Sequence, residues 1–252
     1  MLLTKQFKQI VWGGYMFFFS KFRLLIIFFC IFLAGCGIRA SRNVSFSMDL
    51  PLLTTNVTPD KSKTLYIEEI LDNRDFTVHN KNVYSKTNES VKNNKYDTSQ
   101  PAYNPNKFSK SQTVGGKRGK KNPEILGSFT LKNQTVEYMV KAAVLNAAKK
   151  HGYTVIDNKS DLKKDTVIVK GNISKFWTWE TPDNAGFVDL YTGLVETEIQ
   201  IYKKDKLVSS FVAKGIKERN GWPKDKNFIR VLNEAYQLFT DDLYVQFPHK
   251  IK

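Results

Sequence analysis

The segment Val195–Ile201 reads VETEIQI, with valine, threonine and isoleucine in one set of alternate positions and glutamate and glutamine in the other. Successive side chains of a strand point to opposite faces of a sheet, so this alternation predicts a strand with one buried and one solvated face. The polar cluster Lys203–Lys206 follows and predicts a hairpin turn. Residues 207–218 then predict the returning antiparallel strand.

Three earlier segments also predict strands through their apolar positions and the turn residues beside them. They are 64–71, 153–156 and 165–177. The cluster Asp72–Asp75 ends the first of these strands, because Asp and Asn side chains favour turns.

Two segments predict amphipathic helices. Residues 135–150 place apolar side chains three and four positions apart, and Gly152 follows as the expected C′ residue. The second helix is predicted to begin at an Asp225 N-cap and to end before Pro248.

The predicted order of elements is β–α–β–β–β–β–α, within a single domain over 64–247. Consecutive strands with short connections favour antiparallel pairing, and two amphipathic helices need one common surface on which to bury their apolar sides. We therefore expect an α+β fold in which both helices cover one face of an antiparallel-rich sheet of about four to five strands.

A basic, Asn-rich insert interrupts this order at 76–123. Residues 80–123 carry nine lysines and one arginine against two acidic residues, which is +8 of the chain's formal net charge of +15. Few large aliphatic side chains occur there, so we expect the insert to be disordered. The alternative is a basic arm that contacts anionic lipid headgroups or another polyanion. Because the charge is concentrated in the insert and the leader, it does not predict nucleic-acid binding.

An apolar run over 24–35 follows Lys21 and Arg23 and ends at a cysteine. A basic stretch, a short apolar core and small residues, in this order, are typical of a secretory signal peptide, so 1–35 is predicted to be a leader. The run is shorter than the ~20 apolar residues that span a bilayer. Met16 opens a segment of ordinary signal-peptide length, and we expect translation to start there.

Both cysteines of the chain, Cys30 and Cys36, lie in this region, so the rest has no disulfide, zinc-thiolate site or cysteine nucleophile. Leu33, Ala34, Gly35 and Cys36 form a sequence that resembles the lipobox of bacterial lipoproteins. The resemblance implies recognition of the first three residues by the lipoprotein signal peptidase, cleavage before Cys36, and acylation of Cys36 with palmitate-like chains. The alternative is a transmembrane anchor with a chance cysteine.

Acylated Cys36 would attach the protein to a lipid bilayer, because two or three acyl chains anchor a protein stably. The next residue is Gly37 and not Asp, which the resemblance associates with sorting to the outer membrane, facing the periplasm. Residues 37–63 are rich in Ser, Thr, Asn and Pro. The segment 36–63 is therefore predicted to be a flexible tether.

Several short motifs occur in the order that a known family shows. They are Asp72-Asn73-Arg74 after a strand, Gly116-Lys117-Arg118 in a loop, Gly152-Tyr153 after a helix, and Phe176-Trp177-Thr178-Trp179 at a later strand end. In this order the chain resembles the YajG-like family of bacterial lipoproteins over 64–245, although the insert over 76–113 departs from the family pattern. The resemblance implies an outer-membrane lipoprotein with no established activity, and it brings no catalytic residues.

No set of residues predicts catalysis. The histidines lack a motif partner: His79, His151 and His249. The sequence motifs of serine hydrolases, zinc proteases, P-loop proteins and dinucleotide-binding proteins do not occur, and the glycine-rich stretch Gly115–Lys121 lacks P-loop spacing. Asp241-Asp242 is interpreted as a solvated helix face, because adjacent helical residues point about 100° apart. We predict that the chain is not an enzyme and has no metal or cofactor site.

The tryptophans Trp177, Trp179 and Trp222 are the candidate contact residues. In a strand Trp177 and Trp179 face one side and Phe176 faces the other. One interpretation is that one of these faces packs beneath the helices. The other is an exposed aromatic platform at the strand ends, for a glycan, a lipid or a partner protein. Trp222 lies in a Gly/Pro loop and is expected to be the more exposed.

These patterns predict a membrane-anchored lipoprotein with a non-catalytic structural or accessory role in the cell envelope. Its expected partners are the lipid bilayer, through acylated Cys36, and an envelope protein complex or peptidoglycan. The alternative is a glycan- or lipid-binding module that uses the exposed aromatic residues.

Overall fold

The computed structural model describes residues 43–51, 57–75, 109–118, 125–181 and 188–248. The chain divides into two compact units, Met1–Ser41 and Arg42–Lys252, and all of these residues belong to the second. The predicted leader, Met16 and Cys36 lie outside the described residues, as does most of the insert expected at 76–123. Of the helices described, none is both long enough and apolar enough to cross a membrane.

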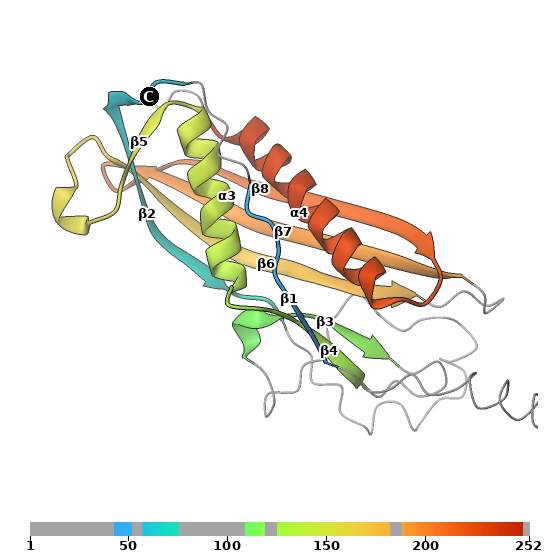
Figure 1. Ribbon diagram of the computed structural model, residues 1–252. Coiled ribbons are helices and arrows are strands. Elements are labelled where there is room, and N and C mark those ends of the chain that lie inside the picture. The colour runs from blue at the N-terminus through green and yellow to red at the C-terminus, as the bar shows by residue number, and fades with distance from the viewer. Residues whose placement is uncertain (1–42, 52–56, 76–108, 119–124, 182–187, 249–252) are drawn as a thin grey trace, which may run out of the picture. The chain divides into compact units, whose positions relative to one another are not determined.

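The described residues form eight strands and two α-helices, with two short 3-10 turns (Figure 1). The strands are β1 (Val44–Phe46), β2 (Asp60–Asp72), β3 (Thr113–Arg118), β4 (Ile125–Leu131), β5 (Tyr153–Ile156), β6 (Val167–Thr181), β7 (Asp189–Lys203) and β8 (Lys206–Gly221). The helices are α3 (Val136–Lys150) and α4 (Asp225–Gln246), and the 3-10 turns are η2 (Lys110–Gln112) and η3 (Lys159–Asp161).

The long strand β6 is the centre of the sheet, and its two edges have different neighbours. Along one edge β6 pairs with β7, and β7 with β8, both in antiparallel orientation. The other edge is divided between two strands. The first half of β6 pairs in parallel with β2, which pairs with β5, whereas Thr178 in the second half pairs in parallel with Gly115 of β3. Strand β4 then pairs with β3, and β1 with β4.

Both helices cover the same face of the sheet (Figure 1). Helix α4 packs on β8, β7 and β6, and α3 packs on β2 and β5. Tyr236 of α4 connects the two helices, because its buried hydroxyl donates a hydrogen bond to the carbonyl oxygen of Met139 in α3, at 2.7 Å. Burial raises the pKa of Tyr236 far above its ordinary value, so the hydroxyl stays protonated and remains a donor. The predicted α+β class is confirmed.

The sheet has more strands than predicted and is mixed: its long pairings, β6–β7 and β7–β8, are antiparallel as expected, but parallel pairs also occur. Four of its strand pairs are parallel: β1–β4, β2–β5, β2–β6 and β3–β6. Strands β1, β3 and β4 are not predicted by the sequence patterns. Their own patterns are weak, since β1 has three residues and β3 contains two glycines. Each is held by pairing with a segment distant in the chain, as Val44 is with Phe129.

Two expected irregular segments therefore contribute to the sheet. The tether expected over 36–63 contains β1, and β2 begins at Asp60, so that prediction is wrong for 44–46 and 60–63. The insert contains β3, so the prediction of disorder is wrong for 113–118. In each case the segment pairs with a strand elsewhere in the chain: β1 with β4, β2 with β5 and β6, and β3 with β4 and, at Gly115, with β6.

The other elements agree closely with their predicted ranges. Strand β5 has the predicted bounds, and α3 ends as predicted before Gly152, which has a positive φ of 81°. Helix α4 differs at its start, because Lys224 is the N-cap residue and makes no side-chain capping bond. Asp225 is instead the first helical residue, where the helix dipole favours a negative side chain.

Arg74 connects the strands at the point where the edge of β6 is divided. Its buried guanidinium pairs with Asp72 through two hydrogen bonds, Nε to Oδ1 at 2.7 Å and Nη2 to Oδ2 at 2.8 Å. It also donates to the carbonyl oxygens of Lys110 and Thr113, both at 2.7 Å, and of Phe176 at 2.9 Å. One side chain thus joins the end of β2 to the start of β3 and to β6, so the Asp-Asn-Arg motif has a structural role.

The outer edge of β8 is partly covered by α4. Asp242 accepts a hydrogen bond from the backbone N–H of Lys214 at 2.8 Å, and Gln246 donates to the carbonyl oxygen of Val212 at 3.0 Å. These bonds use backbone groups that an edge strand would otherwise offer to another chain. The interpretation of Asp241-Asp242 as a solvated face is therefore wrong for Asp242.

Candidate functional site

A β-bulge in β6 decides which face of the sheet carries the tryptophans. Before the bulge, Ile173 points into the core beneath the helices. The register of β6 against β7 shifts directly after Ile173, so the alternation of faces restarts one residue later. Phe176 then points into the core, where its ring lies 5.9 Å from that of Tyr236. Trp177 and Trp179 therefore lie on the other face of the strand from Phe176, and Trp177 faces away from the helices.

Trp177 is buried although it lies on the face without helices, and only 1% of its surface is exposed. The ammonium group of Lys175 lies 5.2 Å from the centre of its ring, within the range of a cation–π interaction. Its cross-strand neighbour Leu194 is also buried. Trp177 is therefore not available to a ligand, and the prediction that it belongs to an exposed aromatic platform is wrong. Trp179, two residues further along β6, is half-buried.

Trp222 is the exposed tryptophan that its Gly/Pro loop predicts, with 62% of its surface accessible. The backbone of this turn is fixed from two sides. The carbonyl oxygen of Trp222 accepts hydrogen bonds from Nδ2 of Asn227 at 2.8 Å and from the hydroxyl of Tyr191 at 3.3 Å. Tyr191 is itself buried and packs edge-on against Phe228. The exposed indole is thus carried on a backbone of defined position.

The residues that follow Trp222 are also solvent-accessible. Those classed as exposed are Pro223, Lys224 and Lys226. The turn therefore presents a large amphipathic ring next to a proline and two long cationic side chains. This combination suits an anionic surface with an apolar interior, or an anionic partner.

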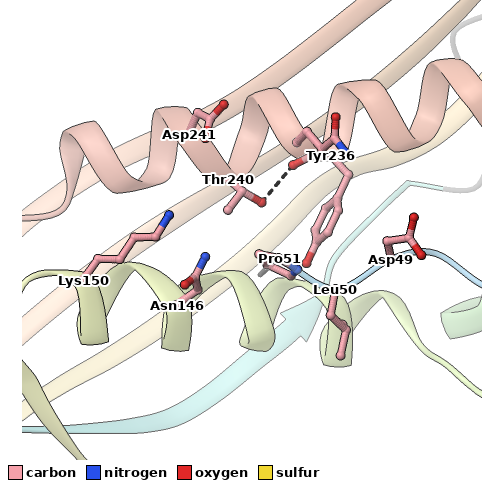
Figure 2. Close-up of a pocket in the computed structure, with 9 residues that line it drawn as sticks. Asp49, Leu50, Pro51, Asn146, Lys150, Tyr236, Thr240 and Asp241 are labelled. Carbon is pink, nitrogen blue, oxygen red and sulfur yellow. Dashed lines mark hydrogen bonds between the residues drawn. The ribbon is translucent and has the colours of Figure 1, made fainter. Parts of the chain in front are cut away.

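A groove of about 620 Å³ lies between the two helices (Figure 2). Its walls include the segment Asp49–Pro51, Asn146 and Lys150 of α3, and Thr240 and Asp241 of α4. The Oδ1 atom of Asn146 is buried and has no hydrogen-bond partner among the residues that the structure describes. The sequence contains no signal for this groove, since it exists only where two helices distant in the chain pack side by side.

His151 contributes to the structure at the ends of the two helices. Its Nε2 atom lies 2.8 Å from the carbonyl oxygen of Tyr244, and its ring stacks on those of Tyr244 and Phe247, with centroids 4.6 and 5.9 Å apart. These contacts join the C-terminal end of α3 to that of α4. His79 and His249 lie outside the described residues.

The glycine-rich stretch expected to be a loop begins as a strand. Gly115 belongs to β3, and a Cβ atom at this position would lie 2.6 Å from the carbonyl oxygen of Thr178. The glycine therefore permits β3 to approach β6 closely, which is a structural role and not a phosphate-binding one. Within the described ranges, no group of three or more His, Cys, Asp or Glu side chains is arranged to hold a metal ion.

No protein-family profile and no curated protein matches the sequence. Among similar solved structures, a Xanthomonas campestris protein of the DUF330 family has 11% identity and a TM-score of 0.41, over 79% of this chain and 91% of that one. A Helicobacter pylori protein described as a neuraminyllactose-binding hemagglutinin homologue has 9% identity and a TM-score of 0.34, over 79% and 92%. A minor lipoprotein from Acinetobacter baumannii has 10% identity and a TM-score of 0.28, over 42% and 81%. Similarities of this size carry no argument about function, and the resemblance to the YajG-like family stays a prediction.

Proposed function

We propose that this protein is a bacterial envelope lipoprotein, held on a bilayer by acyl chains on Cys36, whose domain acts by binding and not by catalysis. The observation that carries the proposal is the sequence Leu33-Ala34-Gly35-Cys36 directly after a short apolar run. Acyl chains on a cysteine hold a folded domain at a bilayer without a membrane-spanning segment. Gly37 after the cysteine favours the outer membrane, with the domain facing the periplasm.

The roles of two buried polar side chains support a non-catalytic domain. The ring of His151 is stacked between the helix ends and bonded to a backbone carbonyl, and the hydroxyl of Tyr236 is bonded to the carbonyl oxygen of Met139. Both groups are of a kind that can serve in proton transfer, but here their bonds hold α3 against α4, and Tyr236 also lines the groove between the helices. The proposed work of the domain is a structural or accessory contact with an envelope protein complex or with peptidoglycan.

The exposure of Trp222 favours a second candidate, a module that binds a glycan or a lipid. An indole with 62% of its surface in water stacks readily on a sugar ring or inserts among lipid headgroups. Titration with peptidoglycan fragments and with lipid vesicles distinguishes this candidate from a purely structural role: a ligand at Trp222 should change the tryptophan fluorescence of the wild type but not that of the Trp222→Phe variant.

The Cys36→Ala variant should incorporate no labelled palmitate and should keep its leader uncleaved. The reason is that Cys36 is both the proposed acyl acceptor and the first residue of the proposed mature chain. Labelling in a bacterial host, followed by electrophoresis of the membrane fraction, measures both effects. Cys30→Ala is the matched control, since it changes the other cysteine of the apolar region and leaves Leu33–Cys36 intact. Wild-type protein without label, or Cys36→Ala protein with label, would contradict the proposal.

A further inference from the structure

The pairing registers place one residue from each of six strands in a row across the sheet. From β1 to β8 the row is Val44, Phe129, Gly115, Thr178, Gly193 and Lys217. On one side of this row lie the starts of β1, β4 and β7 and the ends of β3, β6 and β8 (Figure 1). The first residues of the described fold and the turn with Trp222 are therefore at the same end of the sheet.

The length of the chain before β1 limits where an anchor at Cys36 can be. Cys36 precedes Val44 by eight residues, which span at most about 28 Å when fully extended. Trp222 lies five residues beyond Lys217, which is about 17 Å from the row. Leu207 lies ten residues from Lys217 in the opposite direction, about 34 Å from the row. Measured along the strands, the anchor can reach the level of Trp222 but not that of Leu207.

The chemistry of this end suits the headgroup region of a bilayer. Tryptophan is enriched at membrane–water interfaces, because its ring is largely apolar and its N–H can still bond to water or lipid. Trp222 is exposed, and Asn227 and Tyr191 fix the position of its backbone at this end of the sheet. The exposed Lys224 and Lys226 stand next to it, where their ammonium groups can contact lipid phosphates.

A glycan fits the same surface less well. Sugar sites are usually concave and place polar groups around the ring to bond its hydroxyls. The exposed neighbours of Trp222 in the turn are a proline and two lysines, and Trp177, which would have extended the platform, is buried.

We propose that the end of the sheet that carries Trp222 is the membrane-facing surface of the domain, with the Trp222 indole at the headgroup level of a phospholipid bilayer. This proposal rests on the proposed acylation of Cys36, because the anchor brings that end of the sheet to the bilayer. The opposite end, with the β7–β8 hairpin, then points away from the membrane.

Fluorescence quenching by brominated lipids tests the proposal. Full-length acylated protein is purified from membranes and reconstituted into vesicles of phosphatidylethanolamine and phosphatidylglycerol, with or without bromine near the top of the acyl chains. Wild-type emission should be quenched, and Trp222→Phe should reduce the quenched fraction at least about twofold, since Trp222 is the exposed ring placed at the interface. Lys224→Glu with Lys226→Glu should also weaken quenching, by removing the attraction to anionic lipid.

A tryptophan at the other end of β8 is the matched control. Leu207 is 54% exposed and lies about 50 Å from Trp222 along the strand. In the Trp222→Phe background, Leu207→Trp should add emission that brominated lipid does not quench. Equal quenching of wild type and Trp222→Phe, or strong quenching of Leu207→Trp, would overturn the proposal. A response of Trp222 to peptidoglycan fragments without lipid quenching would also overturn it, in favour of a glycan site.

The palmitate label of the same preparation separates this proposal from the proposed function. Labelled protein whose Trp222 is not quenched contradicts the membrane-facing end and leaves the lipoprotein proposal standing. Protein that takes up no label contradicts the anchor, and with it the reason for that orientation.

Discussion

The Arg74→Met variant should lose about 3 to 5 kcal/mol of unfolding free energy, which is a large part of the stability of an ordinary domain. The guanidinium is buried, and the side chain of its partner Asp72 is only 6% exposed. Methionine fills a similar volume but leaves the Asp72 carboxylate without the charge that compensates it. The carbonyl oxygens of Lys110, Thr113 and Phe176 would also lose the donor that Arg74 supplies.

Urea denaturation followed by circular dichroism measures this loss. Arg74→Lys should recover only part of it, because an ammonium group cannot reproduce the two parallel bonds to Asp72 and the bonds to three carbonyls. Arg230→Met is the matched control, because Arg230 pairs with Glu234 on the surface of α4 with 59% of its side chain exposed. That surface pair should change stability by less than about 0.5 kcal/mol. An Arg74→Met variant as stable as the control would show that Arg74 does not hold the divided edge together.

The Gly215→Ala variant should lose about 3 kcal/mol, because there is no room for a methyl group between β8 and α4. A Cβ atom at Gly215 would overlap the carbonyl oxygen of Ala235 and the backbone nitrogen of Phe239. Gly193 of β7 is similar, with the carbonyl oxygen of Val231 in the place of the methyl group. These obstacles are backbone atoms, which can yield only if the whole helix moves away from the sheet. The two glycines therefore let α4 lie directly on the strands.

Gly171→Ala in β6 is the matched control for this prediction. Its nearest obstacle is the Cδ1 atom of Ile70, at 2.7 Å, which is the flexible end of a side chain and can rotate away. Gly171→Ala should therefore cost about 1 kcal/mol or less, and the double variant Gly193→Ala with Gly215→Ala should cost more than either single change. Equal thermal midpoints for Gly215→Ala and Gly171→Ala would contradict a direct contact between the helix and β8.

The elements that could be predicted are those whose pattern repeats within one segment. The alternation around Val195–Ile201 predicts β7 and its hairpin with β8, and the helical spacing over 135–150 predicts α3. The structure extends β7 back to Asp189, since Tyr191 and Leu194 continue the same two faces. Local periodicity is enough here, because a long segment with one apolar face has few other ways to bury it.

Strands β1, β3 and β4 could not be predicted in this way. The three residues of β1 are too few to show a period, and β3 carries glycines at positions where the chain must pass close to β6. Strand β3 meets the second half of β6, which β2 does not pair with, at the Gly115–Thr178 pair, while β4 pairs with β3 and β1 with β4. Each of these pairings depends on a partner strand elsewhere in the chain and does not exist in either segment by itself.

The candidate site shows the same division. The loop composition around Trp222 predicts its exposure, and the structure adds that the turn is fixed by Asn227 and Tyr191. The face of the sheet on which Trp177 lies depends on a one-residue bulge after Ile173, because the bulge reverses the alternation of side chains along the rest of the strand. No alternation pattern predicts a bulge, because the extra residue is set by the pairing with β7. The groove between α3 and α4 likewise depends on how two separate helices pack.

By itself, the sequence determined the α+β class, the two helices, the β7–β8 hairpin and the expectation of an acylated Cys36. Each of these follows from residues that are close together in the sequence, through periodicity, turn chemistry or a short contiguous motif. Only the tertiary structure decided the divided edge of β6, the Arg74 contacts that close it, and the placement of the start of β1 at the same end as Trp222. These features depend on pairing between residues that are up to about 100 positions apart, as Arg74 is from Phe176. Such pairings are selected by the packing of the whole sheet, because each strand is stable only when its neighbours are in place.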